Sequence, residues 1–212
     1  MAIAPSAALL EIFRQGKLLD DTQLGEADEI ARRLPDGGQL ARELVNRQWL
    51  TQWQINEIEA GRGQELSLGP YVLLELLGQG NMGRVYKARQ RRLKRLVALK
   101  VIHPDCLRDP NAVQRFHREA EAAARANNPN IIQIYDADEA AGVHYLAMEY
   151  VEGTDLAKLI GQSGPLPVAQ ACDAVRQVAL GLQHAHEQGL VHRDIKPSNL
   201  MVVQAQDRSP WA

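Results

Sequence analysis

A short polar stretch near the end of the chain carries residue types suited to phosphoryl transfer. Asp194 is followed five residues later by Asn199, and Pro197 stiffens the segment between them. In such chemistry a carboxylate accepts the proton of an attacking hydroxyl, and an amide oxygen helps to hold magnesium against the phosphates. The alternative is an ordinary polar turn after the helical pattern of Val168 to Glu187. The residues upstream decide between the two interpretations.

A glycine-rich segment upstream could approach phosphate groups. Gly78, Gly80 and Gly83 follow the pattern G-x-G-x-x-G. Alone this pattern is weak, because dinucleotide-binding folds and ordinary hairpin turns both contain it. A dinucleotide fingerprint leads from a strand into a helix, whereas Arg84 to Ala88 has the composition of a second strand. A glycine hairpin can lay its backbone over triphosphate oxygens because no Cβ blocks the approach.

A lysine inside an apolar strand pattern requires a charged partner. Lys100 ends the run that begins at Val97, and burying its ammonium group is costly unless the charge is paired. The helix that starts at Asp109 and Pro110 has an inward apolar stripe, and Glu119 falls within it. Glu121 lies about 200° round this helix from Glu119 and is expected to face solvent. The sequence therefore predicts an ion pair between Lys100 and Glu119.

Together these segments resemble the protein kinase family. All four fixed positions of the catalytic-loop pattern H-R-D-x-x-x-x-N are matched, by His192, Arg193, Asp194 and Asn199. The resemblance covers roughly residues 70 to 203, and its motifs occur in the family's order. The chain looks like a bacterial member of the eukaryotic-like (Hanks-type) serine/threonine kinases. The implied fold class is α+β, with an antiparallel β-sheet amino lobe and the start of a helical carboxy lobe.

The resemblance implies catalytic roles. Asp194 would be the catalytic base, and Lys196, which matches serine/threonine rather than tyrosine kinases, would neutralise charge on the transferred phosphoryl group. Asn199 would hold Mg²⁺, and Lys100, held by Glu119, would contact the phosphates of ATP. His192 would hydrogen-bond to order the loop, and Arg193 would pair with a phosphorylated activation loop. We do not expect a histidine metal site, since His184 and His186 lie about 200° apart on their helix.

The resemblance also implies an ATP-binding set. Met148 falls at the gatekeeper position, the carbonyl of Glu149 and the amide of Val151 would meet the adenine edge, and Asp155 would reach the ribose. Val85, Ala98 and Met201 would enclose the adenine ring, although each could instead be plain core. The complete set is Gly78, Gly80, Gly83, Val85, Ala98, Lys100, Met148, Glu149, Val151, Asp155 and Met201.

Residues 1–66 show helical patterns only. The expected helices are Ser6 to Gln15, Asp21 to Leu34, Gln39 to Arg47, and one that opens with a capping box at Thr51 and Gln54. A break is expected at Pro35 to Gly38. Trp49 and Trp53 are expected to fill the core of this small bundle, which could alternatively be a module that binds another protein.

The remaining domain boundaries follow from changes in periodicity. We expect a linker at residues 67–70, a kinase amino lobe at residues 71–151 and the start of a carboxy lobe at residues 152–212. The segments Ile132 to Asp136 and Val143 to Tyr150 are expected to pair antiparallel around a turn at Ala141 and Gly142. Residues 1–66 are expected to fold apart from the kinase-like region.

Composition excludes several classes of partner. The 212 residues contain 24 Lys+Arg and 26 Asp+Glu, so no nucleic-acid or membrane-surface partner is indicated. Cys106 and Cys172 have no metal spacing and are interpreted as buried small hydrophobes in a reducing compartment. No apolar run approaches the length of a membrane span, so we expect a cytoplasmic protein.

The motifs and the resemblance leave two functions open. The first is a serine/threonine protein kinase domain that uses ATP and Mg²⁺ on protein hydroxyls; the second is a noncatalytic nucleotide-binding or protein-interaction module. Val203 is followed by no D-F-G, activation loop or A-P-E, and Asp207 is interpreted as a solvated turn residue. Because the D-F-G aspartate would be the second metal ligand, we expect the chain as given, truncated before that motif, to be inactive.

Overall fold

The computed structural model describes residues 5–203 of the chain and divides it into two compact units. One unit contains the residues up to Cys106 together with Asp138–Tyr145, and the other contains Leu107–Ala137 together with the residues from Leu146 onward. The expected linker at residues 67–70 lies inside the first unit. Asp207 lies outside the described residues.

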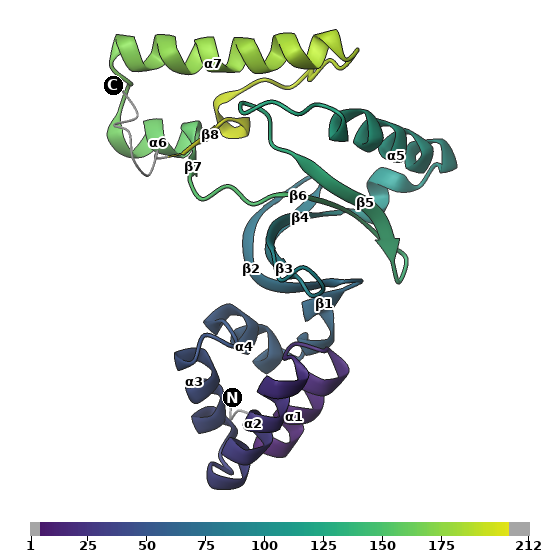
Figure 1. The fold of residues 1–212 in the computed structure, drawn as a ribbon, viewed down its shortest axis with the longest axis vertical. Helices are drawn as coiled ribbons and strands as arrows, with labels where there is room; N and C mark the ends of the chain where they lie inside the picture. Colours follow the sequence, from purple (N-terminus) through teal and green to yellow (C-terminus); the bar gives the residue numbers. More distant parts are fainter. Residues whose placement is uncertain (1–4, 204–212) are drawn as a thin grey trace. The chain divides into compact units, whose positions relative to one another are not determined.

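Four helices form a bundle at the start of the first unit (Figure 1). They are α1 (Ser6–Gln15), α2 (Asp21–Arg33), α3 (Gly37–Asn46) and α4 (Gln52–Glu59). The number and order of the helices are as predicted, but α3 begins at Gly37, within the expected break. The reason is that the Asp36 side chain caps the helix by accepting a hydrogen bond from the Gln39 amide at 2.9 Å.

The core of the bundle is built from aliphatic side chains and one phenylalanine. Fully buried members include Leu9, Phe13, Leu40 and Leu44. Trp49 and Trp53 pack against this core but are only partly buried, so the expectation that they fill it is correct only in part. The Trp53 ring lies 5.9 Å from the Tyr86 ring in the sheet.

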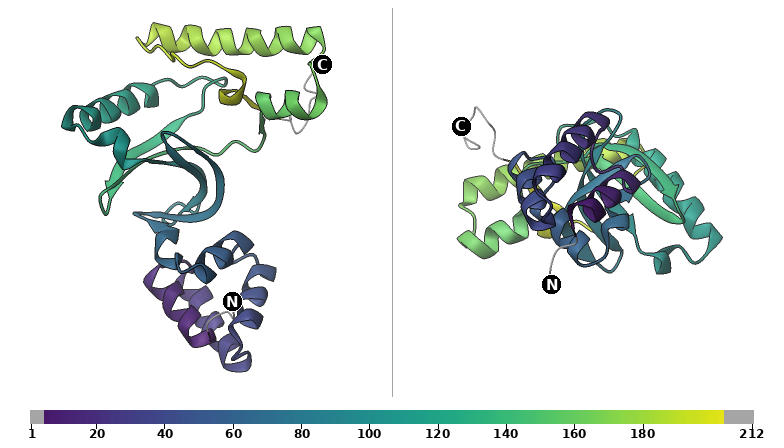
Figure 2. Two further views of the ribbon diagram at one scale, coloured as in Figure 1. Left: turned by 180° about the vertical axis from the view of Figure 1, so that it is seen from behind. Right: turned by 90° about the horizontal axis from the view of Figure 1, so that it is seen from below.

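The strands form an antiparallel sheet in the order β1-β2-β3-β4-β6-β5. Their bounds are β1 (Ser67–Leu68), β2 (Tyr71–Gly80), β3 (Gly83–Gln90), β4 (Leu96–Ile102), β5 (Ile134–Ala140) and β6 (Val143–Glu149). Figure 2 shows β2 and β3 curving together as one long hairpin. The turn at Ala141 and Gly142 is as predicted, and both residues have positive φ, at 51° and 78°. β5 begins at Ile134, two residues later than expected.

Helices dominate the second unit. Its helices are α5 (Pro110–Ala124), α6 (Leu156–Ser163) and α7 (Val168–Glu187), and the short strands β7 (Thr154–Asp155) and β8 (Met201–Val202) pair antiparallel. The long helix has the predicted bounds. Among the described residues, no helix has both the length and the apolar composition needed to span a membrane.

The prediction that both cysteines are buried is wrong. Cys106 is exposed in the 3-10 turn Pro104–Leu107, and Cys172 is exposed on α7. A small apolar side chain is tolerated on a surface, so residue type alone could not decide the burial of either thiol.

Candidate active site

The glycine segment forms the tip of the β2–β3 hairpin. Gly80 pairs with Gly83, and Asn81 and Met82 make the turn between them. The His103 amide donates a hydrogen bond to the Met82 carbonyl at 2.9 Å, which ties the turn to the end of β4. The tip is therefore anchored on one side and exposed on the other.

The glycines at this tip are present for different reasons. Gly83 has a φ of 140°, and a Cβ there would overlap the Val101 carbonyl oxygen, so the fold itself requires glycine. A Cβ on Gly78 or Gly80 would meet no atom of the chain within 4 Å. Packing of the chain does not require glycine at these two positions, which fits a backbone that a ligand must approach closely.

Three of the predicted ATP-binding residues share one face of the sheet. Val85 lies opposite Lys100 in the β3–β4 pair, and Ala98 is two residues before Lys100 on the same strand. Side chains directly opposite each other or two residues apart point to the same side of a sheet. All three are half-buried, whereas Tyr86 and Leu99 on the other face are buried. The half-buried lysine is thus next to the two apolar residues predicted to enclose adenine.

The position of Glu119 differs from the expectation. The stripe on α5 is formed by Val113, Phe116, Ala120 and Ala123, of which Ala120 is buried and the others are half-buried. Glu119 is exposed at the border of this stripe. Its pairing with Lys100, which belongs to the other unit, stays a prediction.

The expected hinge residues lie at the end of β6 and directly after it. Met148, Glu149 and Val151 are half-buried. The Glu149 amide donates to the Gln133 carbonyl at 2.8 Å, and the Gln133 amide donates to Glu149 Oε2 at 3.3 Å. These bonds hold the backbone at the end of β6, and the predicted adenine contacts of this segment remain untested.

Asp155 has a local structural role that sequence reasoning missed. It caps α6: Oδ1 accepts a hydrogen bond from the Lys158 amide at 2.9 Å, and Oδ2 lies 3.1 Å from Lys158 Nζ. The hydrogen bond from the Lys158 amide is the larger cause and that from the Lys158 side chain the next, and both lower the pKa of Asp155 from its ordinary value. The sequence signal for this role was an aspartate placed directly before a helical pattern. Asp155 is also the pairing partner of Met201 across β7 and β8, so two predicted nucleotide-binding residues lie together.

The catalytic-loop residues converge on one carboxylate. Lys196 Nζ lies 2.8 Å from Asp194 Oδ2, and Asn199 Nδ2 donates to the same oxygen at 3.0 Å and to the Asp194 carbonyl at 2.8 Å. The Asp194 amide donates to His192 Nδ1 at 3.3 Å, consistent with the ordering role expected of this histidine. The hydrogen bond from Lys196, followed by that from Asn199, lowers the pKa of Asp194. Asp194 is therefore a carboxylate at neutral pH.

The donor set suits a hard cation at Asn199. Its amide nitrogen is engaged by Asp194, which leaves the side-chain carbonyl oxygen as the available ligand atom. Among the residues that the structure describes, no cluster of three His, Cys, Asp or Glu side chains could hold a metal ion by itself. A magnesium ion bound through Asn199 would thus need oxygen ligands from its nucleotide and from water.

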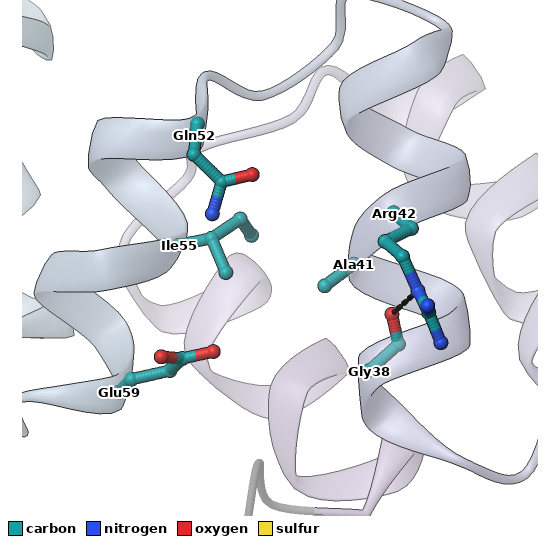
Figure 3. A pocket seen from close by; sticks show the side chains of 6 residues that line it. All are labelled: Gly38, Ala41, Arg42, Gln52, Ile55 and Glu59. Carbon is teal, nitrogen blue, oxygen red and sulfur yellow. Dashed lines mark hydrogen bonds between the residues drawn. The ribbon is translucent and has the colours of Figure 1, made fainter.

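A separate hollow lies within the helical bundle. Figure 3 shows it between α3 and α4, and its volume is about 180 Å³. The lining residues are Gly38, Ala41, Arg42, Gln52, Ile55 and Glu59. None of the predicted nucleotide-binding residues lines it, so this hollow is not part of the candidate active site.

Comparison with known proteins defines the family. The family model described as "Protein kinase domain" matches residues 71–208, which is more than half of the chain. The chain belongs to the protein kinase family. The crystal structure of the Mycobacterium tuberculosis PknI kinase domain is similar, with a TM-score of 0.60 and 35% identity, over 65% of this chain and 57% of that one. The fold is therefore that of a protein kinase, α+β, with the helical region ahead of it.

The curated relatives are bacterial serine/threonine-protein kinases. PknD of Mycobacterium tuberculosis is 46% identical over 136 residues, which cover 63% of this chain and 20% of the relative. PrkC of Bacillus subtilis is 40% identical over 140 residues, covering 66% of this chain and 22% of the relative. The chain thus spans about a fifth of the length of these relatives. Protein kinases in general use ATP and magnesium and act on protein substrates.

Proposed function

We propose that the chain is part of a protein kinase domain that binds Mg-ATP and transfers its γ-phosphate to serine or threonine hydroxyls of proteins, and that the 212 residues alone bind nucleotide without useful transfer. The observation that carries this proposal is the convergence of Lys196 and Asn199 on the ionised carboxylate of Asp194. Two residue types with distinct tasks in phosphoryl transfer are thereby held within hydrogen-bonding distance of the proposed base.

Each of these side chains has a defined task. Asp194 accepts the proton of the attacking hydroxyl, and its lowered pKa keeps it ionised and able to orient that hydroxyl. Lys196 places a positive charge beside Asp194, where the transferred phosphoryl group must arrive. Asn199 presents its amide oxygen to magnesium, and the metal when bound neutralises charge on the phosphates.

The nucleotide is assigned to the half-buried face of β3 and β4. Val85 and Ala98 supply apolar contact for adenine, Lys100 supplies positive charge, and the backbone at Gly78 and Gly80 is open to phosphate oxygens. Glu119, Met148, Glu149, Val151, Asp155 and Met201 complete the site in this proposal. We further propose a cytoplasmic location and a role for the helical region in binding another protein.

Nucleotide binding provides the test. We expect the 212-residue chain to bind a fluorescent ATP analogue. Lys100→Met should weaken binding by at least tenfold, because it removes the ammonium charge that pairs with a phosphate group. The matched control is Lys94→Met, since Lys94 is exposed in the β3–β4 turn and should leave affinity unchanged. Equal affinity in wild type and Lys100→Met, or no binding by either, would contradict the proposed site.

Phosphoryl transfer is measured separately with radiolabelled Mg-ATP and a generic basic protein. Asp194→Asn removes the proposed base and keeps the size of the side chain. Because no D-F-G aspartate occurs in the sequence, we expect the chain to bind nucleotide weakly and to transfer no label at a useful rate. Label transferred by the wild type and lost in Asp194→Asn would show that this expectation is wrong and that the chain is an active enzyme.

A further inference from the structure

Strand β2 has an irregular outer edge just before the glycine hairpin. β1 pairs only with Tyr71 and Val72, so beyond Val72 no strand among the described residues covers this edge. On the inner side the β2–β3 register shifts between Leu73 and Glu75, which leaves Leu74 without a partner residue. The carbonyl groups of such a bulge need hydrogen-bond donors from elsewhere.

The first turn of α4 supplies these donors. Gln54 Nε2 donates to the Leu73 carbonyl at 2.7 Å, and Thr51 Oγ1 donates to the Leu74 carbonyl at 2.6 Å. Gln54 is a fully buried polar side chain, at 0% exposure. We name this arrangement the β2 clamp, formed by Thr51 and Gln54 on the carbonyls of Leu73 and Leu74.

The same two side chains also cap their own helix. Gln54 Oε1 accepts from the Thr51 amide at 2.8 Å, and Thr51 Oγ1 accepts from the Gln54 amide at 3.1 Å. These capping bonds orient both side chains, so that the remaining donors face β2 in fixed directions. A clamp held in this way is pre-organised and loses little side-chain freedom when it binds the strand.

Further contacts join the helices to the sheet. The Trp53 ring packs against Tyr86, which lies opposite Leu76 of β2. Arg91, which directly follows β3, donates to the Gly16 carbonyl at 3.1 Å and to the Gly69 carbonyl at 2.8 Å. Burial lowers the pKa of Arg91. A guanidinium nevertheless stays protonated in proteins, so this side chain is a charged donor.

The clamp coincides with a sharp change in burial along β2. Tyr71 to Leu73 are buried, Leu74 is half-buried, and every residue from Glu75 to Gly80 is exposed. Beyond the clamp, β3 is the only strand of the described residues that pairs with β2 before the glycine hairpin. A bulge bends its strand, and the two hydrogen bonds of the clamp hold the backbone at this bulge.

We propose that Thr51 and Gln54 are positioning residues for nucleotide binding, acting through the β2 bulge on the backbone of Gly78 and Gly80. This inference rests on the proposed function, because it assumes that the hairpin approaches the nucleotide. It places the helical region within the nucleotide-binding machinery of the chain. The ligand itself is contacted by the hairpin and not by the clamp.

Two substitutions remove the clamp in different ways. Gln54→Leu deletes the buried donor, while Thr51→Asp keeps an N-cap acceptor for α4 but places a carboxylate oxygen where the donor to Leu74 was. Thr51→Ser keeps both the cap and the donor and is the conservative rescue. The matched control is Gln52→Leu, since Gln52 is on the same helix, is exposed and borders the hollow between α3 and α4 rather than β2 (Figure 3).

Two measurements on the whole chain test the proposal. The first is the dissociation constant of a fluorescent ATP analogue, and the second is hydrogen exchange of the amides of residues 75–83. We expect Gln54→Leu and Thr51→Asp each to weaken binding about three- to tenfold, the size of one net hydrogen bond, and to speed exchange in residues 75–83. Thr51→Ser and Gln52→Leu should match the wild type in both measurements.

The outcomes separate this inference from the proposed function. Unchanged affinity and unchanged exchange in folded Gln54→Leu and Thr51→Asp would overturn the inference, as would a Thr51→Ser variant that behaves like Thr51→Asp. If the wild type binds no nucleotide, the proposed function fails, and exchange alone decides whether the clamp orders the hairpin. If Gln54→Leu does not fold, Thr51→Asp, which retains the helix cap, decides the question.

Discussion

The two oxygens of Asp194 have different surroundings. Lys196 and Asn199 both contact Oδ2, and within residues 5–203 no hydrogen bond to Oδ1 is present. In the proposed function, Oδ1 is therefore the oxygen that remains to accept a proton from a substrate hydroxyl. Lys196 stabilises the ionised form, and Asn199 limits rotation of the carboxylate.

The charge of Lys196 can be tested through the acidity of Asp194. A positive neighbour favours the carboxylate, so the pKa of Asp194 lies below the ordinary value of about 3.9 and should rise towards it in Lys196→Met. The stabilisation that this interaction gives the folded state is complete above the ordinary pKa and is lost as the pH falls through the lowered one. Carboxyl chemical shifts followed by NMR during an acid titration measure the change.

Lys158→Met is the control for that titration, because Lys158 contacts Asp155 and not Asp194. It should raise the pKa of Asp155 and leave that of Asp194 in place. An Asp194 titration that is the same in wild type and Lys196→Met would show that the ion pair does not form in solution.

At the scale of elements, the β2–β3 hairpin contains one glycine that the fold requires and others that packing of the chain does not require. Gly83 must pass close to the Val101 carbonyl on β4, and the φ of 140° at this position is accessible mainly to glycine. A Cβ on Gly80, its partner in the register, would meet no atom within 4 Å. The fold therefore depends on Gly83, whereas Gly80 is available for ligand approach.

This difference predicts two separable phenotypes. Gly83→Ala should lower the free energy of unfolding by an amount on the order of 2–4 kcal/mol, because it combines a backbone conformation that disfavours side chains with a steric overlap. Gly80→Ala should change stability by less than about 1 kcal/mol and instead weaken binding of the ATP analogue. Thermal unfolding and binding measured on both variants test this. Equal destabilisation by the two substitutions would contradict the assignment.

The sequence predicted those parts of the structure that depend on neighbouring residues. The capping box of Thr51 and Gln54, the helix at Val168–Glu187 and the turn at Ala141 and Gly142 all follow from short-range patterns. The β2 clamp could not be predicted, because its acceptors lie 19 and 23 residues from their donors and exist only where the register shifts. Exposure of Cys106 and Glu119 depends likewise on which surfaces meet after folding.

On the scale of the whole molecule, the helical region and the first strands share one compact unit. The core cluster that contains Leu9 and Phe13 also contains Val72 of β2, and Leu74 packs against it. Even so, most members of this cluster come from the helices themselves. The sequence-based division at residue 66 states that the helices fold without the strands, and it stays a prediction.

Expression of residues 1–66 alone tests that division. We expect a helical circular dichroism spectrum, since the buried aliphatic residues of α1, α3 and α4 pack mainly on one another. The midpoint of thermal unfolding should be lower than that of the same helices in the whole chain, because the buried amide of Gln54 loses its acceptor and a chain this short has a small core. A random-coil spectrum would show that the helices require the strands.

Arg91 limits how the helical region could be transferred to another protein. Its guanidinium contacts Gly16 at the end of α1, Ser67 in β1 and Gly69 in the following turn, so one side chain joins segments that a designer would treat as separate parts. A chimera that grafts residues 1–66 onto the sheet of another kinase would leave the Gly16 carbonyl without Arg91 and the Gln54 amide without the Leu73 carbonyl. Each buried polar group left unsatisfied costs about 1–3 kcal/mol. The smallest segment to transfer is therefore the four helices together with β1, β2, β3 and Arg91.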